Sequence, residues 1–414
     1  MPRVVILGGG FAGFSVARIL ARQAFDVVLV DRSSYHLYTP LLYEVATGFL
    51  ASDERQRKVA LREGVGIPLT APGLTILQDE VVGMDPTAHR VFLKEQGETS
   101  YDFAVVALGS EPDFFGIPGA AARAIPLKFL EHAFHIRDRL HDLIEMCRQG
   151  KQERFRVIVV GGGPNGVETA AELARFAQVH RCNSAMLANH IEISLVEAGP
   201  CILHACSAAV RNVAGKRLTR LGVRILSSAP VASVQQDRIQ IKTPEGERHL
   251  PYDLLIWAGG VKPVSVVSSL GLPVSLHGFL CVGETLQVEG CKNVFALGDS
   301  ACVLDETTGS SVPGLAQVAL EEAEVVSENI KRVSEDRTPL RAARFSWQTI
   351  IPLGGRYAVA EIGGVTVKGI AAYALRKAAD LRYFLRVLPP LSACRIWFRG
   401  AKTFMHNEER GVLY

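Results

Sequence analysis

Two glycine-rich turns, 153 residues apart, constrain the fold of this chain more than any other feature. The first turn, 8–13, reads GGGFAG after the apolar run VVIL, and the second, 161–166, reads GGGPNG after the run VIVV. Each has the order strand, G-x-G-x-x-G, helix. Glycine permits a tight turn, and the backbone N–H groups of the helix N-terminus then face a pyrophosphate. The chain is therefore predicted to be an α/β protein with two Rossmann-like dinucleotide-binding domains.

An acidic residue ends the strand that follows each turn. Asp31 lies 18 residues after Gly13, where an acid reaches the hydroxyls of an adenosine ribose. The second unit has Glu197 at the end of the predicted strand 192–196, after an inserted segment. An acid here favours a free 2′-hydroxyl over a 2′-phosphate. Glu197 therefore predicts NADH as the second dinucleotide, while the longer spacing leaves NADPH open.

Three other apolar segments support this layout. Segments 101–109 and 253–260 are each predicted to be a buried strand that ends in glycine. Segment 293–299 is predicted to be a strand that leads to Gly298 and Asp299. A Gly-Asp pair at a strand end is by itself typical of a turn. Beside two dinucleotide units it indicates a carboxylate that binds a polyol hydroxyl.

The composition excludes several other classes of protein. With 414 residues, of which 48% are hydrophobic and 21% charged, the chain is long enough for two or three folded domains. A net charge of +3 is too small to predict a nucleic-acid partner. No continuous apolar stretch of about 20 residues predicts a transmembrane helix. Ordered structure is expected from residue 2, which leaves no room for a signal peptide.

The eight cysteines are scattered, and none forms a C-x-x-C pair. The sequence therefore predicts no zinc site and no other metal site. Cys201 and Cys206 form a C-x4-C pair after the second dinucleotide unit, where we expect structural thiols rather than a redox pair that faces a flavin.

These segments together resemble the type II NADH dehydrogenases, single-chain NADH:quinone oxidoreductases among the two-dinucleotide flavoproteins. The resemblance runs in order over residues 3–340 and is weaker beyond. Its most specific part is 31–48, DRSSYHLYTPLLYEVATG, which matches a D-R-x-x-Y-H-x-x-x-P-L-L-Y-x-V-A-T-G run. The resemblance implies non-covalent FAD, hydride transfer from NADH to the flavin, and reduction of a membrane quinone without proton pumping.

The resemblance also implies roles for individual residues. Gly298 and Asp299 hold the ribityl chain, and Lys128 lies near the flavin. Glu168 lies near the point where nicotinamide and flavin meet, or is a first-turn glutamate that favours the positive end of its helix. The expected cofactor-binding residues are Gly8, Gly10, Phe11, Ala12, Gly13, Asp31, Arg32, Pro40, Leu42, Val81, Gly109, Lys128, Gly161, Gly163, Pro164, Asn165, Gly166, Glu197, Gly259, Gly298, Asp299, Ala316 and Gln317.

Segment 316–319, AQVA, matches the start of the flavin and quinone segment of that family. If it opens a helix, its N-terminus stabilises negative charge on the reduced flavin. The chain has Glu321 and Glu322 where many members have glutamine, which leaves the electron acceptor open. The two glutamates are expected to be an exposed helical pair, with a buried, proton-relaying glutamate as the alternative. The catalytic candidates are Glu168, Gln317 and Glu321.

Residues 365–404 form a basic tail with eight lysine and arginine residues and one acid, Asp380, for a local net charge of +7. Apolar residues recur at helical spacing from Ile370 to Leu388, and Pro389-Pro390 is expected to separate two helices. A basic amphipathic helix of this kind binds an anionic membrane surface. The predicted fold therefore ends in a C-terminal amphipathic helical membrane-binding region, with packing on the body or a homodimer contact as alternatives.

The expected domains are an FAD-binding domain at 1–130 and 285–340, an NADH-binding domain at 131–284, and a membrane-associated or dimer region at 341–414. The expected location is peripheral to a membrane, on its cytoplasmic face. One alternative function is a sulfide:quinone oxidoreductase-like enzyme, which needs cysteines facing the flavin and no nicotinamide site. The others are an NADH-sensing or partner-binding flavoprotein and a reductase of a small iron–sulfur protein.

Overall fold

The computed structural model describes residues 1–48, 65–183, 191–304, 312–342 and 348–409. The chain divides into two compact units. Unit 1 comprises Met1–Leu37, Gly66–Glu111 and Val261–Trp347, and unit 2 comprises Tyr38–Val65, Pro112–Gly260 and Gln348–Tyr414.

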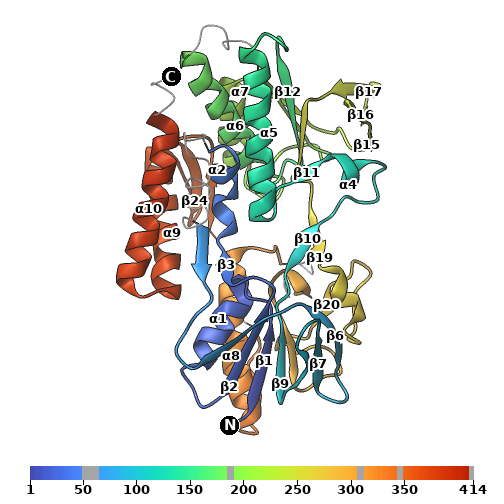
Figure 1. Ribbon diagram of the computed structural model, residues 1–414, viewed down its shortest axis with the longest axis vertical. Helices are drawn as coiled ribbons and strands as arrows, with labels where there is room; N and C mark the ends of the chain where they lie inside the picture. The colour runs from blue at the N-terminus through green and yellow to red at the C-terminus, as the bar shows by residue number, and fades with distance from the viewer. Residues whose placement is uncertain (49–64, 184–190, 305–311, 343–347, 410–414) are drawn as a thin grey trace. The chain divides into compact units, whose positions relative to one another are not determined.

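Unit 1 is built on a parallel five-stranded sheet with the strand order β21-β9-β1-β2-β5. Its central strand β1 is completely buried from Val4 to Leu7, which explains its continuous apolar sequence. Helices α1 and α8 pack along each other beside this sheet (Figure 1). The elements are β1 (Arg3–Leu7), α1 (Phe11–Leu20), β2 (Asp26–Asp31), β5 (Leu74–Gln78), β9 (Phe103–Val106), β21 (Val294–Ala296) and α8 (Ala316–Ser334).

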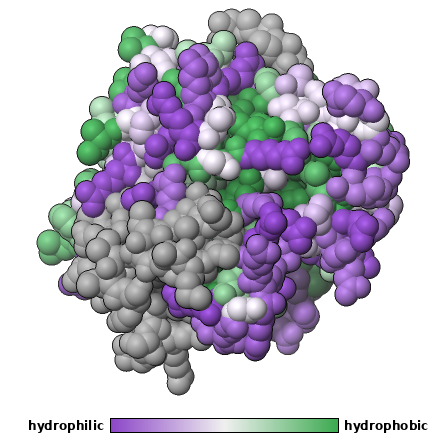
Figure 2. Space-filling view, turned by 90° about the horizontal axis from the view of Figure 1, so that it is seen from above, coloured by the Kyte–Doolittle hydropathy of each residue, from purple (hydrophilic) through white to green (hydrophobic). Residues whose placement is uncertain are grey.

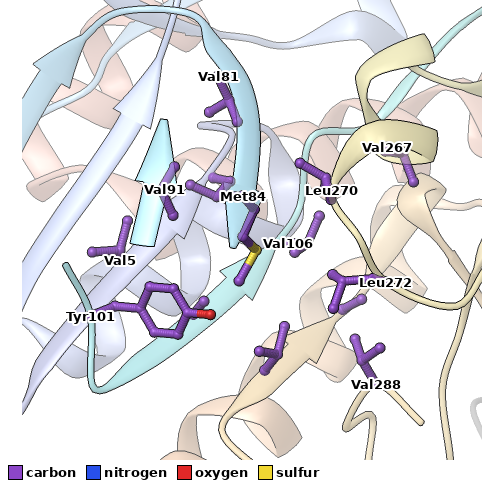
Figure 3. Packing of buried hydrophobic residues seen from close by; sticks show 14 of the residues in the cluster. Val5, Val81, Met84, Val91, Tyr101, Val106, Val267, Leu270, Leu272 and Val288 are labelled. Atoms are coloured by element: carbon purple, nitrogen blue, oxygen red, sulfur yellow. The ribbon is translucent and has the colours of Figure 1, made fainter. Parts of the chain in front are cut away.

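A second, antiparallel sheet, β6-β7-β8, covers part of unit 1. Figure 3 shows the core between the two sheets, where Val5 of β1 and Val106 of β9 lie with Val81, Met84 and Val91 of the second sheet. Alternate residues of β1, β7 and β9 enter this core, as a strand period of two requires. In β6 a register shift between Val81 and Gly83 lets both Val81 and Met84 face inward. The further elements of the unit are β3 (Tyr35–Leu37), β4 (Gly66–Pro68), β6 (Val81–Asp85), β7 (Arg90–Leu93), β8 (Gly97–Ser100), β19 (Val261–Pro263), η3 (Ser265–Ser269), β20 (Leu280–Cys281), η4 (Gly298–Ser300) and β22 (Ala301–Cys302).

Unit 2 repeats this plan with a parallel sheet of order β11-β18-β12-β13-β14. A three-stranded antiparallel sheet, β15-β16-β17, precedes β18 in the chain, just as β6-β7-β8 precedes β9 in unit 1. Ile158 and Val160 of β12 face this second sheet in a shared core. The elements are β11 (Ile125–Pro126), β12 (Phe155–Val160), α6 (Pro164–Asn183), β13 (Ile191–Val196), α7 (Ala208–Leu221), β14 (Val223–Leu226), β15 (Val231–Val234), β16 (Arg238–Thr243), β17 (Gly246–Pro251) and β18 (Leu254–Trp257).

The last part of unit 2 is an antiparallel sheet, β23-β24-β25, on which α9 packs. Ala358 and Ala360 of β24 face Ala372 of α9, and these small side chains let the helix approach the sheet closely. Helix α10 lies beside α9 (Figure 1). The remaining elements are η1 (Thr39–Leu41), α2 (Leu42–Ala46), β10 (Ser110–Pro112), α4 (Ala120–Arg123), α5 (Leu130–Arg148), β23 (Thr349–Pro352), β24 (Ala358–Ile362), β25 (Val365–Gly369), α9 (Ile370–Val387) and α10 (Pro390–Glu409).

The observed helices confirm two of the predicted boundaries and differ from the prediction at two others. The prediction that 316–319 opens a helix is confirmed by α8, and the predicted break at Pro389-Pro390 is confirmed by the end of α9 at Val387. The first helix, predicted at 13–23, begins earlier, at Phe11. It also ends earlier, at Leu20, because the Gln23 N–H bonds to Leu20 O in a tighter turn. Part of the predicted insertion 178–190 continues α6 to Asn183, and its remainder lies outside the described residues. No helix within the described part of the chain is long and apolar enough to cross a membrane.

Candidate functional site

The turn after β1 has a backbone that only glycine can adopt. Gly8 has a φ of +101°, and a Cβ there would collide with the backbone oxygen of Ala107 at the end of β9. A Cβ on Gly13 would collide with Gly8 O, so that α1 starts directly against the turn. The Gly8 N–H also donates to Val30 O of β2 at 2.8 Å. The start of α1 is thus held at the carboxyl end of the parallel sheet, where such sheets bind dinucleotides.

The turn after β12 repeats these contacts in unit 2. Gly161 has a φ of +108°, and its Cβ would collide with Ala258 O at the end of β18. A Cβ on Gly166 would collide with Gly161 O, as Gly13 would with Gly8. The Gly161 N–H donates to Val196 O at 2.8 Å. The two halves therefore present the same glycine turn, built from unrelated side chains.

The two strand-end acids close these turns. Asp31 Oδ2 accepts the N–H of Gly9 at 2.6 Å, and burial raises the pKa of its carboxyl while this bond lowers it. Glu197 Oε2 accepts the N–H of Gly162 at 2.5 Å, and its Oε1 accepts that of Gly199 at 2.5 Å. Both acids thus lie against the glycine turn at a strand end, in the position from which an acid binds ribose hydroxyls.

His36 supports the first turn and was missed as a site residue, although it lies in the segment 31–48. It is buried, and its Nδ1 donates to the carbonyl oxygen of Gly9 at 3.1 Å. Burial lowers its pKa to about 4, so the ring is neutral at neutral pH. The Phe11 ring packs edge-on against it with centroids 4.7 Å apart. The signal in the sequence was the histidine itself, a polar residue within a predicted dinucleotide unit.

Asp299 lies in η4, a turn that hydrogen bonds hold on several sides. Its Oδ2 accepts the Ser110 hydroxyl at 2.5 Å, and the neighbouring Ser300 Oγ accepts the N–H of Gly109 at 2.8 Å. The N–H of Gly298 donates to Glu322 Oε2 at 2.7 Å. The expectation of an exposed glutamate pair is therefore wrong for Glu322, which is 3% exposed. Its side chain is buried together with Val318, Ala319 and Ala323 of the same helix.

The other expected FAD residues in unit 1 are distributed along the same elements. The start of α8 carries the half-buried Ala316 and the exposed Gln317, and Glu321 follows one turn later with partial exposure. Leu315, the residue before the helix, makes no side-chain cap. The remaining positions are Gly10 before α1, Ala12 in its first turn, the exposed Arg32, and Val81 at the start of β6.

The second set of expected residues lies in unit 2. Pro164 and Asn165 are exposed at the start of α6, and Asn165 Nδ2 donates to Leu127 O at 3.1 Å, next to Lys128. This bond joins the glycine turn to the segment that carries the lysine. Gly163 precedes α6, Gly259 follows β18, and Pro40 and Leu42 lie in η1 and α2.

Glu168 lies in the second turn of α6, so the interpretation as a first-turn glutamate at the helix end is wrong. Its side chain keeps some exposed surface but is surrounded by protein. Burial raises its pKa to about 8; Arg376 lowers it, and Asp380 and Glu44 raise it. At neutral pH this carboxyl group is therefore mainly protonated and can give up a proton.

Glu168 adjoins what we call the buried ionic cluster: Tyr38, Glu44, Arg376, Lys377 and Asp380. Arg376 Nη1 lies 2.9 Å from Asp380 Oδ1, which also accepts the Tyr38 hydroxyl at 2.7 Å. Lys377 Nζ lies 3.0 Å from Glu44 Oε1. Sequence reasoning missed this cluster because Tyr38 and Glu44 are far in the chain from the three members on α9.

Where the structure describes the side chains of the basic tail, its cations are of two kinds. Arg376 and Lys377 face inward into the buried ionic cluster and are not available to a surface ligand. Arg382, Arg386 and Arg395 are exposed. Hydrophobic side chains project at the left edge of Figure 2, the side on which Figure 1 shows α9 and α10. The exposed large hydrophobic residues of the two helices are Ile370, Leu375, Leu385, Leu391 and Phe398.

The cysteines Cys147, Cys201 and Cys206 are free thiols with intermediate exposure. Arg211 Nη1 lies 3.8 Å from Cys201 Sγ, and burial raises the pKa of the Cys206 thiol. Within the described residues, no group of three or more His, Cys, Asp and Glu side chains is arranged to hold a metal ion.

Comparisons with known proteins agree with this geometry. Residues 2–323 match the family model described as pyridine nucleotide-disulphide oxidoreductase. A type II NADH:quinone oxidoreductase of Mycobacterium tuberculosis is 29% identical over 95% of this chain and 87% of its own length. Among solved structures, NDH2 of Plasmodium falciparum in complex with NADH has a TM-score of 0.83 at 20% identity, covering 99% of this chain and 98% of that one. The sulfide:quinone oxidoreductase of Aquifex aeolicus has a TM-score of 0.79 at 19% identity, covering 95% and 92%.

Proposed function

Because the chain belongs to the pyridine nucleotide-disulphide oxidoreductase family, we propose that it is a type II NADH:quinone oxidoreductase, which oxidises NADH through non-covalent FAD and reduces a membrane quinone. The observation that carries this proposal is the repeated turn with its acid. Asp31 on Gly9 and Glu197 on Gly162 form two equivalent sites, and two dinucleotides need two such sites.

The residues of unit 1 fit FAD. Gly8 and Gly13 keep the turn tight at the start of α1, since a side chain on either would collide with backbone. A Cβ on Gly10 would meet no protein atom within 4 Å, which leaves room for a pyrophosphate there. Asp31 would bind the adenosine ribose and Asp299 the ribityl chain, and Val81 would contact the adenine through its backbone. The flavin supplies the redox chemistry, by accepting a hydride and passing on two electrons. The start of α8 would stabilise negative charge beside it.

The residues of unit 2 fit NADH. Gly161 and Gly166 repeat the pyrophosphate cradle, and Glu197 would bind the free 2′-hydroxyl of the adenosine ribose. A 2′-phosphate would place negative charge against this carboxylate, so NADH is the proposed donor over NADPH.

Reduction of a quinone to a quinol consumes two protons, and Glu168 is suited to hold one. Its carboxyl is protonated at neutral pH, and the buried ionic cluster beside it fixes its surroundings. We expect the Glu168→Gln variant to bind both cofactors and to lose most NADH oxidation, by about 10²- to 10⁴-fold if the proton transfer is rate-limiting. Unchanged rates would remove Glu168 from the mechanism.

The tail is proposed to bind the membrane that contains the quinone. Ile370, Leu375 and Leu385 are exposed on α9, and so are Arg382 and Arg386 of the same helix. Apolar groups and cations on one helix favour an anionic bilayer surface, where each cation contributes about 1 kcal/mol. The cytoplasmic face follows because inner leaflets carry the anionic lipids. A homodimer contact through the same face is the alternative.

Vesicle flotation tests this surface. The protein should float with vesicles that contain phosphatidylglycerol and stay unbound with phosphatidylcholine alone. Replacing Leu385 and Arg386 by Glu should abolish flotation and leave NADH oxidation with ferricyanide intact. Flotation of this variant at the wild-type level would contradict the membrane role, and conversion of a dimer into a monomer would favour the alternative.

Steady-state kinetics test the activity itself. The purified protein should be yellow and should oxidise NADH when a short-chain quinone is the acceptor. Sulfide should not replace NADH, and substitution of Cys147, Cys201 and Cys206 by serine should leave the rate unchanged. A sulfide-dependent rate that these substitutions abolish would instead support the sulfide:quinone oxidoreductase-like alternative.

A further inference from the structure

Glu322 is a buried carboxyl group to which the proposed reaction assigns no role. It lies on α8, is 3% exposed, and accepts the N–H of Gly298 at 2.7 Å. Gly298 begins η4, and the next residue is Asp299. Glu322 therefore holds the main chain immediately before the carboxylate that is proposed to bind the flavin ribityl chain.

The turn that Glu322 holds is confined by small residues. A Cβ on Gly298 would lie 3.2 Å from Ala12 Cβ of α1 and 3.9 Å from Ala319 Cβ of α8. Gly298 has a φ of +63°, so its N–H direction is fixed by a conformation that other residues rarely adopt. An N–H group in this position needs an acceptor, and Glu322 supplies it.

The charge of Glu322 is set by its surroundings. Burial raises its pKa to about 7, the N–H of Gly298 lowers it, and the carboxylates of Asp299 and Glu321 raise it further. Helix α1, which packs along α8, carries one charged residue, Arg18, whose guanidinium lies 5.7 Å from the Phe14 ring centroid. Glu322 therefore gains its negative charge near neutral pH, beside Asp299.

We propose that Glu322 is a positioning residue for FAD, which fixes the Gly298–Ser300 turn and weakens FAD binding when it ionises. This inference rests on the proposed function, since it needs FAD at η4. The neutral carboxyl orients the turn without adding charge. The ionised carboxylate still accepts from Gly298, but it places a second negative charge beside Asp299 and near the anionic pyrophosphate of FAD.

The rate of FAD release from the holoprotein tests this proposal, followed by the fluorescence of free FAD after dilution. Wild-type protein should release FAD about three- to tenfold faster at about pH 8.5 than at about pH 6, as expected for like charges in a partly buried site. Glu322→Gln keeps an acceptor but has no charge, so it should release FAD slowly at both pH values. Glu322→Leu has no acceptor and should release FAD about tenfold faster than wild type at both, from the loss of one buried hydrogen bond.

Glu324→Gln, on the exposed side of the same helix, is the matched control and should keep the wild-type pH dependence. A Glu322→Gln variant with the wild-type ratio of rates would overturn the proposal, as would wild-type release that does not change with pH. If Glu322→Leu does not fold, Glu322→Gln alone decides. A protein that holds no FAD at any pH would instead contradict the proposed function.

Discussion

The hydroxyl of Tyr38 donates a hydrogen bond of 2.7 Å to the carboxylate of Asp380, 342 residues later in the chain. Both side chains are buried, and Arg376 Nη1 contacts the same oxygen at 2.9 Å. Arg376 Nη2 also donates to Pro40 O at 3.0 Å. The segment before α2 is thus attached to α9 through the carboxylate of Asp380 and through Arg376 itself.

Replacement of Asp380 by Ala should destabilise the protein by about 3–5 kcal/mol, because it leaves Arg376 charged and buried without its partner. Tyr38→Phe removes only one hydrogen bond and should cost about 1–2 kcal/mol. Urea unfolding of the two variants measures both effects. The matched control is Arg90→Gln, which breaks an ion pair whose side chains are 52% and 50% exposed and should cost no more than about 1 kcal/mol. Equal losses for Asp380→Ala and Arg90→Gln would contradict the importance of burial here.

Glu168 should make stability depend on pH. Its pKa is raised from 4.5 to about 8, so the unfolded chain releases this proton at a lower pH than the folded chain does. The folded state therefore loses stability as the pH rises from about 4.5 to about 8, and the loss is complete above that range. Glu168→Gln removes this loss, and its unfolding midpoint should gain on wild type at about pH 8.5 relative to about pH 4. A difference between variant and wild type that is the same at both pH values would contradict the raised pKa.

Glu197 and Asp31 should affect different dinucleotides. Glu197→Gln weakens the bonds to Gly162 and to the proposed ribose hydroxyl, so kcat/KM for NADH should fall about 10- to 100-fold, with the preference over NADPH reduced. The flavin content, read from the ratio of visible to ultraviolet absorbance, should not change. Asp31→Asn should have the opposite pattern, with less bound flavin and an unchanged KM for NADH per flavin. Loss of flavin in the Glu197 variant would contradict the assignment of the two turns.

His36 should act as a neutral hydrogen-bond donor. His36→Phe keeps a ring beside Phe11 but loses the bond to Gly9 O, so FAD affinity should fall about three- to tenfold. Because the pKa of His36 is about 4, this loss should be the same at pH values from about 6 to about 8. Titration of the apoprotein with FAD measures it. A loss that appears only at the acidic end would show that the charged ring matters.

The glycine turns, the strand-end acids and the start of α8 were predictable because each depends on a few neighbouring residues. Gly8 and Gly161 have positive φ angles, which glycine adopts readily, and Asp31 ends a strand whose apolar sequence predicts it. The bond of His36 to Gly9 could not be predicted in this way, since 27 residues separate the partners and the bond depends on how the chain returns to the turn.

The burial of Glu322 and of the ionic cluster was not predicted from the sequence. Glu322 lies on the stripe of buried residues Val318, Ala319, Ala323 and Val326, a helical spacing that is visible in the sequence. This spacing predicts that Glu322 faces inward. The adjacent Glu321 instead favoured the prediction that both glutamates are exposed to solvent. Arg376 and Lys377 look like membrane-facing cations in the tail, and only the folded structure shows that they pair with Asp380 and Glu44.

The most direct test of the account is rapid mixing of the holoprotein with NADH in the absence of oxygen, followed by a short-chain quinone. The flavin absorbance near 450 nm should bleach within the turnover time and recover as fast when the quinone is added. Bleaching without recovery would contradict quinone as the acceptor and favour a sensing or partner-reducing role. An absorbance that NADH leaves unchanged would contradict the central claim that the two glycine turns serve one flavin and one nicotinamide.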